Sequence, residues 1–116
     1  TSIIMIDWKA AILSPDDNLS QAINVLNSES SRVVLVSDEK GRLLGTVTDG
    51  DIRRALQTVD YQSLKARDLM SSPFLSVGMN DNLLTCESLM HDHKITALAV
   101  IDDESNIIGI IKSYDI

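Results

Sequence analysis

Aromatic residues, cysteine and proline are scarce in this 116-residue sequence. Phe, Trp and Tyr together make up 3% of the chain, whereas hydrophobic residues of all kinds make up 44%. The core must therefore be aliphatic, built from Ile, Leu and Val. The single cysteine, Cys86, excludes an internal disulfide and a cysteine-based metal cluster. One free thiol fits a reducing compartment, and we expect a cytoplasmic protein.

Basic charge and long apolar runs are also missing. The net charge is −7, and no segment carries the basic patch typical of proteins that bind nucleic acids or anionic membranes. No apolar run approaches the ~18 residues that a membrane span requires. We therefore expect partners that include neither nucleic acid nor membrane. The length favours a compact unit with a real core.

The sequence repeats itself after 64 positions. Residues 17–52 align with residues 81–116 without a gap: "DNL" opens both segments, and an Asp-Ile pair closes both. Between these ends, "RVVLV" aligns with "TALAV" and "LLGTV" with "IIGII". The two segments share an apolar pattern and the turn residues that interrupt it. At so long a period, this predicts two copies of a small domain, over residues 1–63 and 64–116.

Each copy has the pattern helix, strand, strand, helix. The first helix follows a capping residue, Asp17 or Asp81, and carries an apolar stripe at helical spacing. The apolar, β-branched strand runs suggest sheets covered on both faces, which gives an α/β (α+β) fold. A short helical lead precedes each copy. The strands are expected at residues 32–37, 42–48, 96–101 and 107–112, and the leads at residues 8–13 and 64–70.

The stretch "GTVTDGDIRRAL" passes from the second strand into a helix and allows two interpretations. Thr48-x-x-Asp51 has the spacing of a capping box, and that spacing alone favours a purely structural role. The same turn also suits a nucleotide. The N–H groups of a helix N-terminus bind phosphate, Asp51 can accept ribose hydroxyls, and Arg53 and Arg54 can neutralise phosphates.

Other chemistry finds no support in the sequence. The glycine-rich nucleotide motifs G-x-G-x-x-G and G-x-x-x-x-G-K-[ST] are absent. His91 and His93 stand two positions apart, which places them on different faces of a helix, so we interpret them as an exposed helix end. Cys86 belongs to the apolar stripe and is expected in the core. No set of nucleophile, base and oxyanion donors is apparent, and we expect no enzyme activity from this chain alone.

The duplicated order, its spacing and the Gly-apolar-apolar-Thr-x-x-Asp turn resemble a tandem CBS (cystathionine β-synthase) domain pair, or Bateman module. "GTVTDGDIRRAL" and "DWKAAILSPDDNLSQAI" are most similar to pairs beside bacterial sugar-phosphate nucleotidyltransferase domains. "TDGDIRR" and "ARDLMSSP" also resemble the pair of arabinose-5-phosphate isomerases. The resemblance implies two repeats packed with pseudo-twofold symmetry and adenine nucleotides in clefts between them.

Carried over by motif, the resemblance places Thr48 and Asp51 at phosphate and ribose, Arg53 at phosphate, and the start of the first strand near the base. The second motif departs from the pattern, because Lys112 and Tyr114 replace the threonine and glycine, and the sequence stops before a closing helix could form. The first site is therefore expected to be the better built. The candidate ligand-binding residues are Thr48, Asp51, Arg53, Arg54, Arg32, Val33, Val34, Lys112, Asp115 and Thr96.

The expected function is control of an attached catalytic domain, a sugar-phosphate nucleotidyltransferase in our preferred interpretation. The ligand would be AMP, ADP, ATP or a related adenosyl compound, no cofactor would be required, and the module would form a homodimer. Two alternatives stay open: a ligand-free dimerisation or assembly module, and the CBS pair of an arabinose-5-phosphate isomerase. The sequence favours neither activation nor inhibition.

Overall fold

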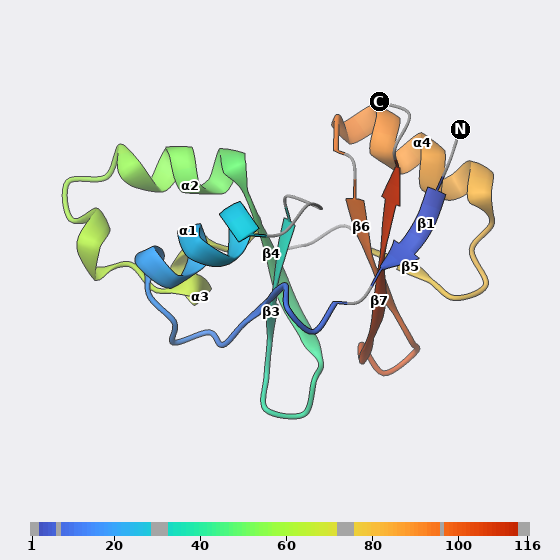
Figure 1. Ribbon diagram of the computed structural model, residues 1–116, viewed down its shortest axis with the longest axis horizontal. Helices are drawn as coiled ribbons and strands as arrows, with labels where there is room; N and C mark the ends of the chain where they lie inside the picture. The colour runs from blue at the N-terminus through green and yellow to red at the C-terminus, as the bar shows by residue number, and fades with distance from the viewer. Residues whose placement is uncertain (1–2, 7, 29–32, 72–75, 96, 114–116) are drawn as a thin grey trace.

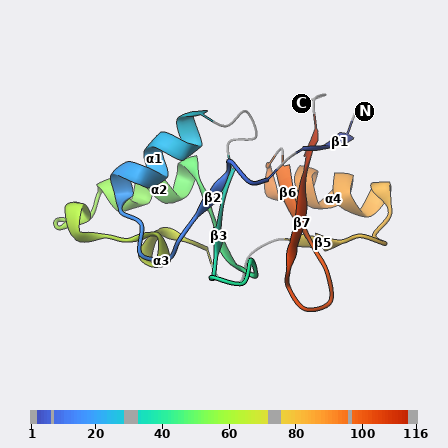
Figure 2. The ribbon, with the colours of Figure 1, turned by 60° about the horizontal axis from the view of Figure 1, so that its bottom comes forward.

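The fold consists of two sheets that stand side by side, with helices on their outer faces (Figures 1 and 2). The computed structural model describes residues 3–6, 8–28, 33–71, 76–95 and 97–113. In chain order the elements are β1 (Ile3–Ile6), β2 (Ile12–Leu13), α1 (Leu19–Ser28), β3 (Val33–Ser37), β4 (Leu43–Thr48), α2 (Asp49–Leu56), the 3-10 turn η1 (Tyr61–Ser63), α3 (Ala66–Leu69), β5 (Ser76–Gly78), α4 (Leu83–His93), β6 (Ala97–Ile101) and β7 (Ile107–Ser113).

The hairpins β3–β4 and β6–β7 confirm the repeat residue by residue. Val33 pairs with Thr48 in the first hairpin, and Ala97 pairs with Lys112 in the second, 64 positions later. Every other pair of β3–β4 recurs at the same shift, including the irregularity near the turn. The predicted order of helix, strand, strand, helix is confirmed for the first repeat as α1, β3, β4 and α2.

Three apolar clusters account for the packing. One lies between the repeats and is built from equivalent positions of the two hairpins, which is how a pseudo-twofold axis arranges identical patterns. The other two lie on the outer faces, under α1, α2 and α3 in the first repeat and under α4 in the second. The central cluster includes Val33, Leu35 and Leu43 from the first hairpin with Ala97, Ala99 and Ile107 from the second.

The helix caps lie one residue later than the sequence predicted. Asn18, and not Asp17, exchanges hydrogen bonds with Gln21 across the first turn of α1, at 2.8 and 2.9 Å. Asn82 is likewise the N-cap of α4. Asp17 instead accepts from the backbone N–H of Ser14 in the preceding turn. Both residue types cap well, and the turn before the helix decides which of the two does so.

The opening segment of each repeat contacts the sheet of the other repeat. β1, from the start of the chain, pairs antiparallel with β7 of the second repeat. In return, α3 packs in the outer core of the first repeat, and Ser71 bridges to Thr46 on β4. The sequence predicted a helical lead in both places. It is confirmed at α3, but it is wrong for residues 8–13, where a turn and the strand β2 are found.

The two hairpin turns meet at the end of the molecule opposite the last residues of β7 (Figure 1). Arg42 and Asn106, which are equivalent positions, form an antiparallel bridge there. Asp38 and Asp102 shape the turns by accepting backbone N–H groups within each one. The backbone N–H of Arg42 lowers the pKa of Asp38, and the side-chain amide of Asn106, together with its backbone N–H, lowers the pKa of Asp102.

Acid is therefore expected to weaken the turns. A carboxyl group with a lowered pKa contributes stability that is complete above its unfolded pKa, at about pH 4, and is lost as pH falls toward the folded pKa. The double variant Asp38→Asn/Asp102→Asn should lose less of its remaining stability than wild type between about pH 5 and about pH 2. Urea unfolding across this range measures the difference. Parallel pH profiles for the two proteins would contradict the assignment.

One turn residue carries strain that its counterpart avoids. Ser105 has φ 69°, while the equivalent Gly41 has φ 83°. Only glycine adopts this region without steric cost. Ser105→Gly is therefore expected to raise the free energy of unfolding by about 0.5–1 kcal/mol, net of the extra freedom of glycine in the unfolded chain. Gly41→Ser is the matched opposite: a Cβ there meets no atom within 4 Å, so any loss of stability comes from the backbone alone.

Candidate functional site

The predicted turn is formed by the end of β4 and the first turn of α2. Thr48 is the N-cap of α2, with extended backbone angles, and forms a capping box with Asp51. The carboxylate of Asp51 reaches back, and its Oδ2 accepts from the Thr48 backbone N–H at 2.9 Å and from the Thr48 hydroxyl at 3.2 Å. The structural interpretation of this motif is thus confirmed.

The second oxygen of Asp51 has partners from farther along the chain. Arg54, one helical turn later, donates Nη2 to Oδ1. Ser71 donates its hydroxyl to the same atom at 3.1 Å, from the lead of the second repeat. The Asp51 side chain is only 4% exposed, and these donors are what allow a carboxylate to be buried there.

Ser71 is a site residue that the sequence did not reveal. Its backbone N–H donates to the carbonyl of Thr46 at 2.9 Å, which fixes its hydroxyl beside Asp51. The two side chains are 20 positions apart and meet only because α3 packs against β4. The one local signal was the Ser-Ser-Pro break in "ARDLMSSP" just after the lead helix. This break does not indicate which residue Ser71 contacts.

The other candidates fall into four groups. Val33 belongs to the cluster between the repeats, whereas its neighbour Val34 is fully buried on the outer side of the sheet, in the first repeat's core. Arg53 and Arg54 are exposed. Lys112 is half-buried at the position on β7 equivalent to Thr48. Arg32, Thr96 and Asp115 lie outside the described residues.

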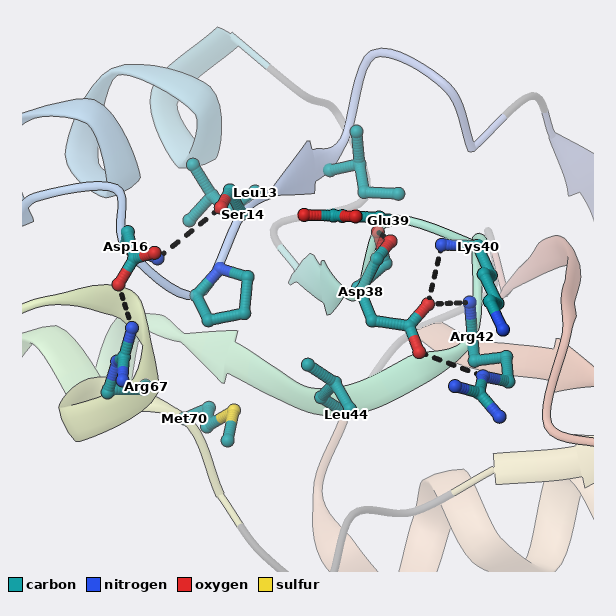
Figure 3. Close-up of a pocket in the computed structure, with 13 residues that line it drawn as sticks. Leu13, Ser14, Asp16, Asp38, Glu39, Lys40, Arg42, Leu44, Arg67 and Met70 are labelled. Atoms are coloured by element: carbon teal, nitrogen blue, oxygen red, sulfur yellow. Dashed lines mark hydrogen bonds and ion pairs between the residues drawn. The ribbon is translucent and has the colours of Figure 1, made fainter.

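A cavity of about 680 Å³ lies near the turn of the first hairpin, and none of the predicted site residues lines it (Figure 3). Its floor is apolar, with Leu13, Leu44 and Met70. Its rim is charged: Arg67 pairs with Asp16, and the Arg42 Nε donates to Asp38 at 2.8 Å. Figure 3 shows these two ion pairs on opposite sides of the cavity.

Comparison with known proteins decides the family. The family model described as "CBS domain" matches residues 4–58 and again residues 66–116. The chain belongs to the CBS domain family. It carries two copies, so it is a tandem CBS pair of the Bateman type. The sequence-based recognition and the mixed α and β fold of two repeated units are confirmed.

The CBS pair is similar to proteins of several kinds. It is 33% identical over 106 residues to arabinose 5-phosphate isomerase KdsD of Francisella tularensis, which covers 90% of this chain and 32% of the isomerase. CBSX2 in complex with AMP is 25% identical with a TM-score of 0.75, covering 87% of this chain and 79% of that one. Listeria monocytogenes CbpB in complex with c-di-AMP is 25% identical with a TM-score of 0.75, covering 93% and 84%.

Other chemistry in the CBS pair is limited in the part of the chain that the structure describes. No group of three or more His, Cys, Asp or Glu side chains there is placed to hold a metal ion. Cys86 is buried, and desolvation raises the pKa of its thiol, which disfavours the reactive thiolate. His91 and His93 are exposed at the end of α4. Within the described ranges, no helix is long and apolar enough to cross a membrane.

Proposed function

We propose that this CBS pair binds an adenine nucleotide between its repeats and thereby regulates an attached catalytic domain in the cytoplasm. The observation that carries the proposal is the Thr48–Asp51 turn, which holds a buried carboxylate at the N-terminus of α2. A helix N-terminus favours phosphate, and a fixed carboxylate favours a sugar diol, so the turn joins the two polar parts of a nucleotide. The CBSX2 complex with AMP and the CbpB complex with c-di-AMP support adenine as the base.

The proposed roles follow the family motif. Thr48 and the backbone N–H groups of the first turn of α2 would bind phosphate, with Arg53 as a further cation, and Asp51 would accept from the ribose. Arg32, Val33 and Val34 would lie near the base. Because the Val34 side chain is fully buried in the outer core, its contact would run through its backbone. In the second site, Lys112, Asp115 and Thr96 would take the equivalent places, and we expect weaker binding there.

The attached domain is proposed at the level of its substrate class, a sugar phosphate. Motif similarity favours a sugar-phosphate nucleotidyltransferase, whereas the relative with 33% identity is an arabinose 5-phosphate isomerase. The chain spans 32% of that isomerase's length, so the remaining length of such a protein is where catalysis would reside. Sequencing the parent reading frame on both sides decides between the two.

Isothermal titration of the CBS pair with AMP, ADP, ATP and S-adenosylmethionine tests the ligand proposal. We expect heat of binding from at least one adenine nucleotide, and no comparable heat from a matched guanine nucleotide. The absence of binding heat with all four compounds would overturn the proposal. Equal binding of the guanine control would retain a nucleotide site but reject selectivity for adenine.

A second candidate function, assembly into a homodimer, has its own supporting observation. Leu83 and Leu84 at the start of α4 are 54% and 74% exposed, although Leu19, the equivalent of Leu83, is only 5% exposed. Exposed neighbouring leucines on a helix are typical of contact surfaces. Sedimentation with and without nucleotide separates the functions: a stable dimer indifferent to nucleotide favours assembly alone, and a Leu83→Ser/Leu84→Ser variant should then be monomeric.

A further inference from the structure

The two oxygens of Asp51 have different kinds of partner. Oδ2 is held by the Thr48 backbone and hydroxyl, groups of the helix cap itself. Oδ1 is held by two side chains that the cap does not require, those of Arg54 and Ser71. A capping box needs one Asp51 oxygen on the Thr48 backbone N–H and no donor on the other oxygen. The donors on Oδ1 therefore call for a separate explanation.

These donors stand where a ribose would have to bind. A ribose offers hydroxyl donors to a carboxylate, and Oδ1 already accepts from a guanidinium and a hydroxyl. A buried carboxylate without donors is costly, so the unliganded protein supplies its own. A nucleoside can reach Oδ1 only by displacing at least one of them.

Arg54 is the donor that is free to move. Its side chain is 70% exposed on a flexible stem, so its charge can be solvated in another position. Ser71, by contrast, is held by its own backbone hydrogen bond to Thr46.

Arg54 also lies close to the place where a phosphate would bind. A Cβ built on Gly50 would be 3.5 Å from Arg54 Nη1 and 3.8 Å from Thr48 Oγ1. The guanidinium thus folds back over the first turn of α2, toward the helix N-terminus.

We propose that Arg54 exchanges partners when a nucleotide binds, an inference that rests on the proposed function of the site. In the unliganded protein it satisfies Oδ1 of Asp51. When ribose hydroxyls replace it there, its guanidinium turns to the phosphate at the start of α2. The exchange makes the site selective for phosphorylated nucleosides: adenosine displaces Arg54 and offers it nothing, whereas AMP offers it a new anionic partner.

The test compares the affinities of adenosine and AMP for wild type and Arg54→Met. Loss of the exposed ion pair should tighten adenosine binding by about two- to five-fold. AMP binding gains the same factor but also loses a charge-assisted hydrogen bond, which should weaken it by about ten-fold or more relative to adenosine. The preference for AMP over adenosine should therefore fall by about ten-fold or more. Arg54→Lys should restore part of this preference, since it keeps the charge without the forked donors.

Arg67→Met is the matched control, because Arg67 is an exposed arginine in an ion pair with Asp16, on the rim of the cavity near the turn of the first hairpin. It should leave both affinities unchanged. If wild type binds neither compound, the inference fails, and the proposed function fails with it only if ADP, ATP and S-adenosylmethionine also give no binding heat. If wild type binds but Arg54→Met keeps the wild-type preference, only the inference is overturned. Equal weakening of adenosine and AMP in Arg54→Met also overturns it, because Arg54 would then be an ordinary contact without exchange.

Discussion

Asp51→Ala is expected to abolish nucleotide binding at the first site and to lower the free energy of unfolding by about 2–3 kcal/mol, because a helix cap and a buried hydrogen bond to a charged group are lost together. Four donor groups lose their acceptor: the N–H and hydroxyl of Thr48, the guanidinium of Arg54 and the hydroxyl of Ser71. Arg54 regains water, but Ser71 is only partly exposed and stays unsatisfied. Urea unfolding and titration calorimetry measure the two effects.

Asp68→Ala separates the cap from the network. Asp68 has the same N3 position at the start of α3 and accepts from the Lys65 backbone N–H at 2.9 Å, but it is exposed. Its loss should cost about 1 kcal/mol, as for a single cap, and leave nucleotide binding intact. If both substitutions cost the same, the contacts of Arg54 and Ser71 contribute nothing to stability. If Asp51→Ala still binds nucleotide like wild type, Asp51 is not the ribose ligand.

Gly45→Ala is expected to lower the free energy of unfolding by about 1–3 kcal/mol, the usual range for overpacking a close contact. A Cβ at Gly45 would lie 2.7–2.9 Å from the Cβ, Cγ and Sδ atoms of Met70. The inner part of the methionine cannot swing away as its tip could, so α3 must shift from β4. Because Ser71 follows Met70 directly, the same shift should draw its hydroxyl away from Asp51.

Two further variants isolate this contact. Gly78→Ala places a methyl group in β5 with its nearest neighbour, Asp81 Oδ2, at an ordinary 3.8 Å, and should change stability little. Adding Met70→Ala to Gly45→Ala should recover part of the loss, because the cavity left by Met70 receives the new methyl group. Purely additive effects of the two substitutions would show that Gly45 matters for another reason.

Most of the local structure could be predicted from the sequence, and the errors have physical causes. Turn residues and apolar runs placed the hairpin strands within a residue, because those signals are local. In "VVLV", residues 33–36, every position is apolar, so no alternation distinguished Val33, which faces the other repeat, from Val34, which faces the outer core. Asp17 and Asn18 both cap well, and only the turn with Ser14 resolved the choice.

Long-range contacts were beyond the reach of sequence patterns. β1 and β7, which are far apart in the sequence, pair with each other, and the sequence of neither strand predicts its partner. The contact from Ser71 to Asp51 arises from tertiary packing, so the motif revealed the capping box but not its additional donors. The cavity near Asp38 was missed for the same reason, since its lining comes from β2, the first hairpin turn and α3.

The contacts of each repeat's opening segment with the other repeat determine how the module unfolds. Each sheet contacts a segment of the other repeat: Ile3–Ile6 supply an edge strand to the sheet of the second repeat, and Ser71 bridges to Thr46 at the edge of the sheet of the first. A cut between residues 63 and 64 would therefore separate each sheet from a segment that covers it. The stabilities of the two repeats are therefore coupled, and we expect them to unfold in a single cooperative transition and not one after the other. If one of these opening segments detaches, the sheet of the opposite repeat loses the contacts that the segment makes. Local unfolding in either repeat therefore lowers the stability of both.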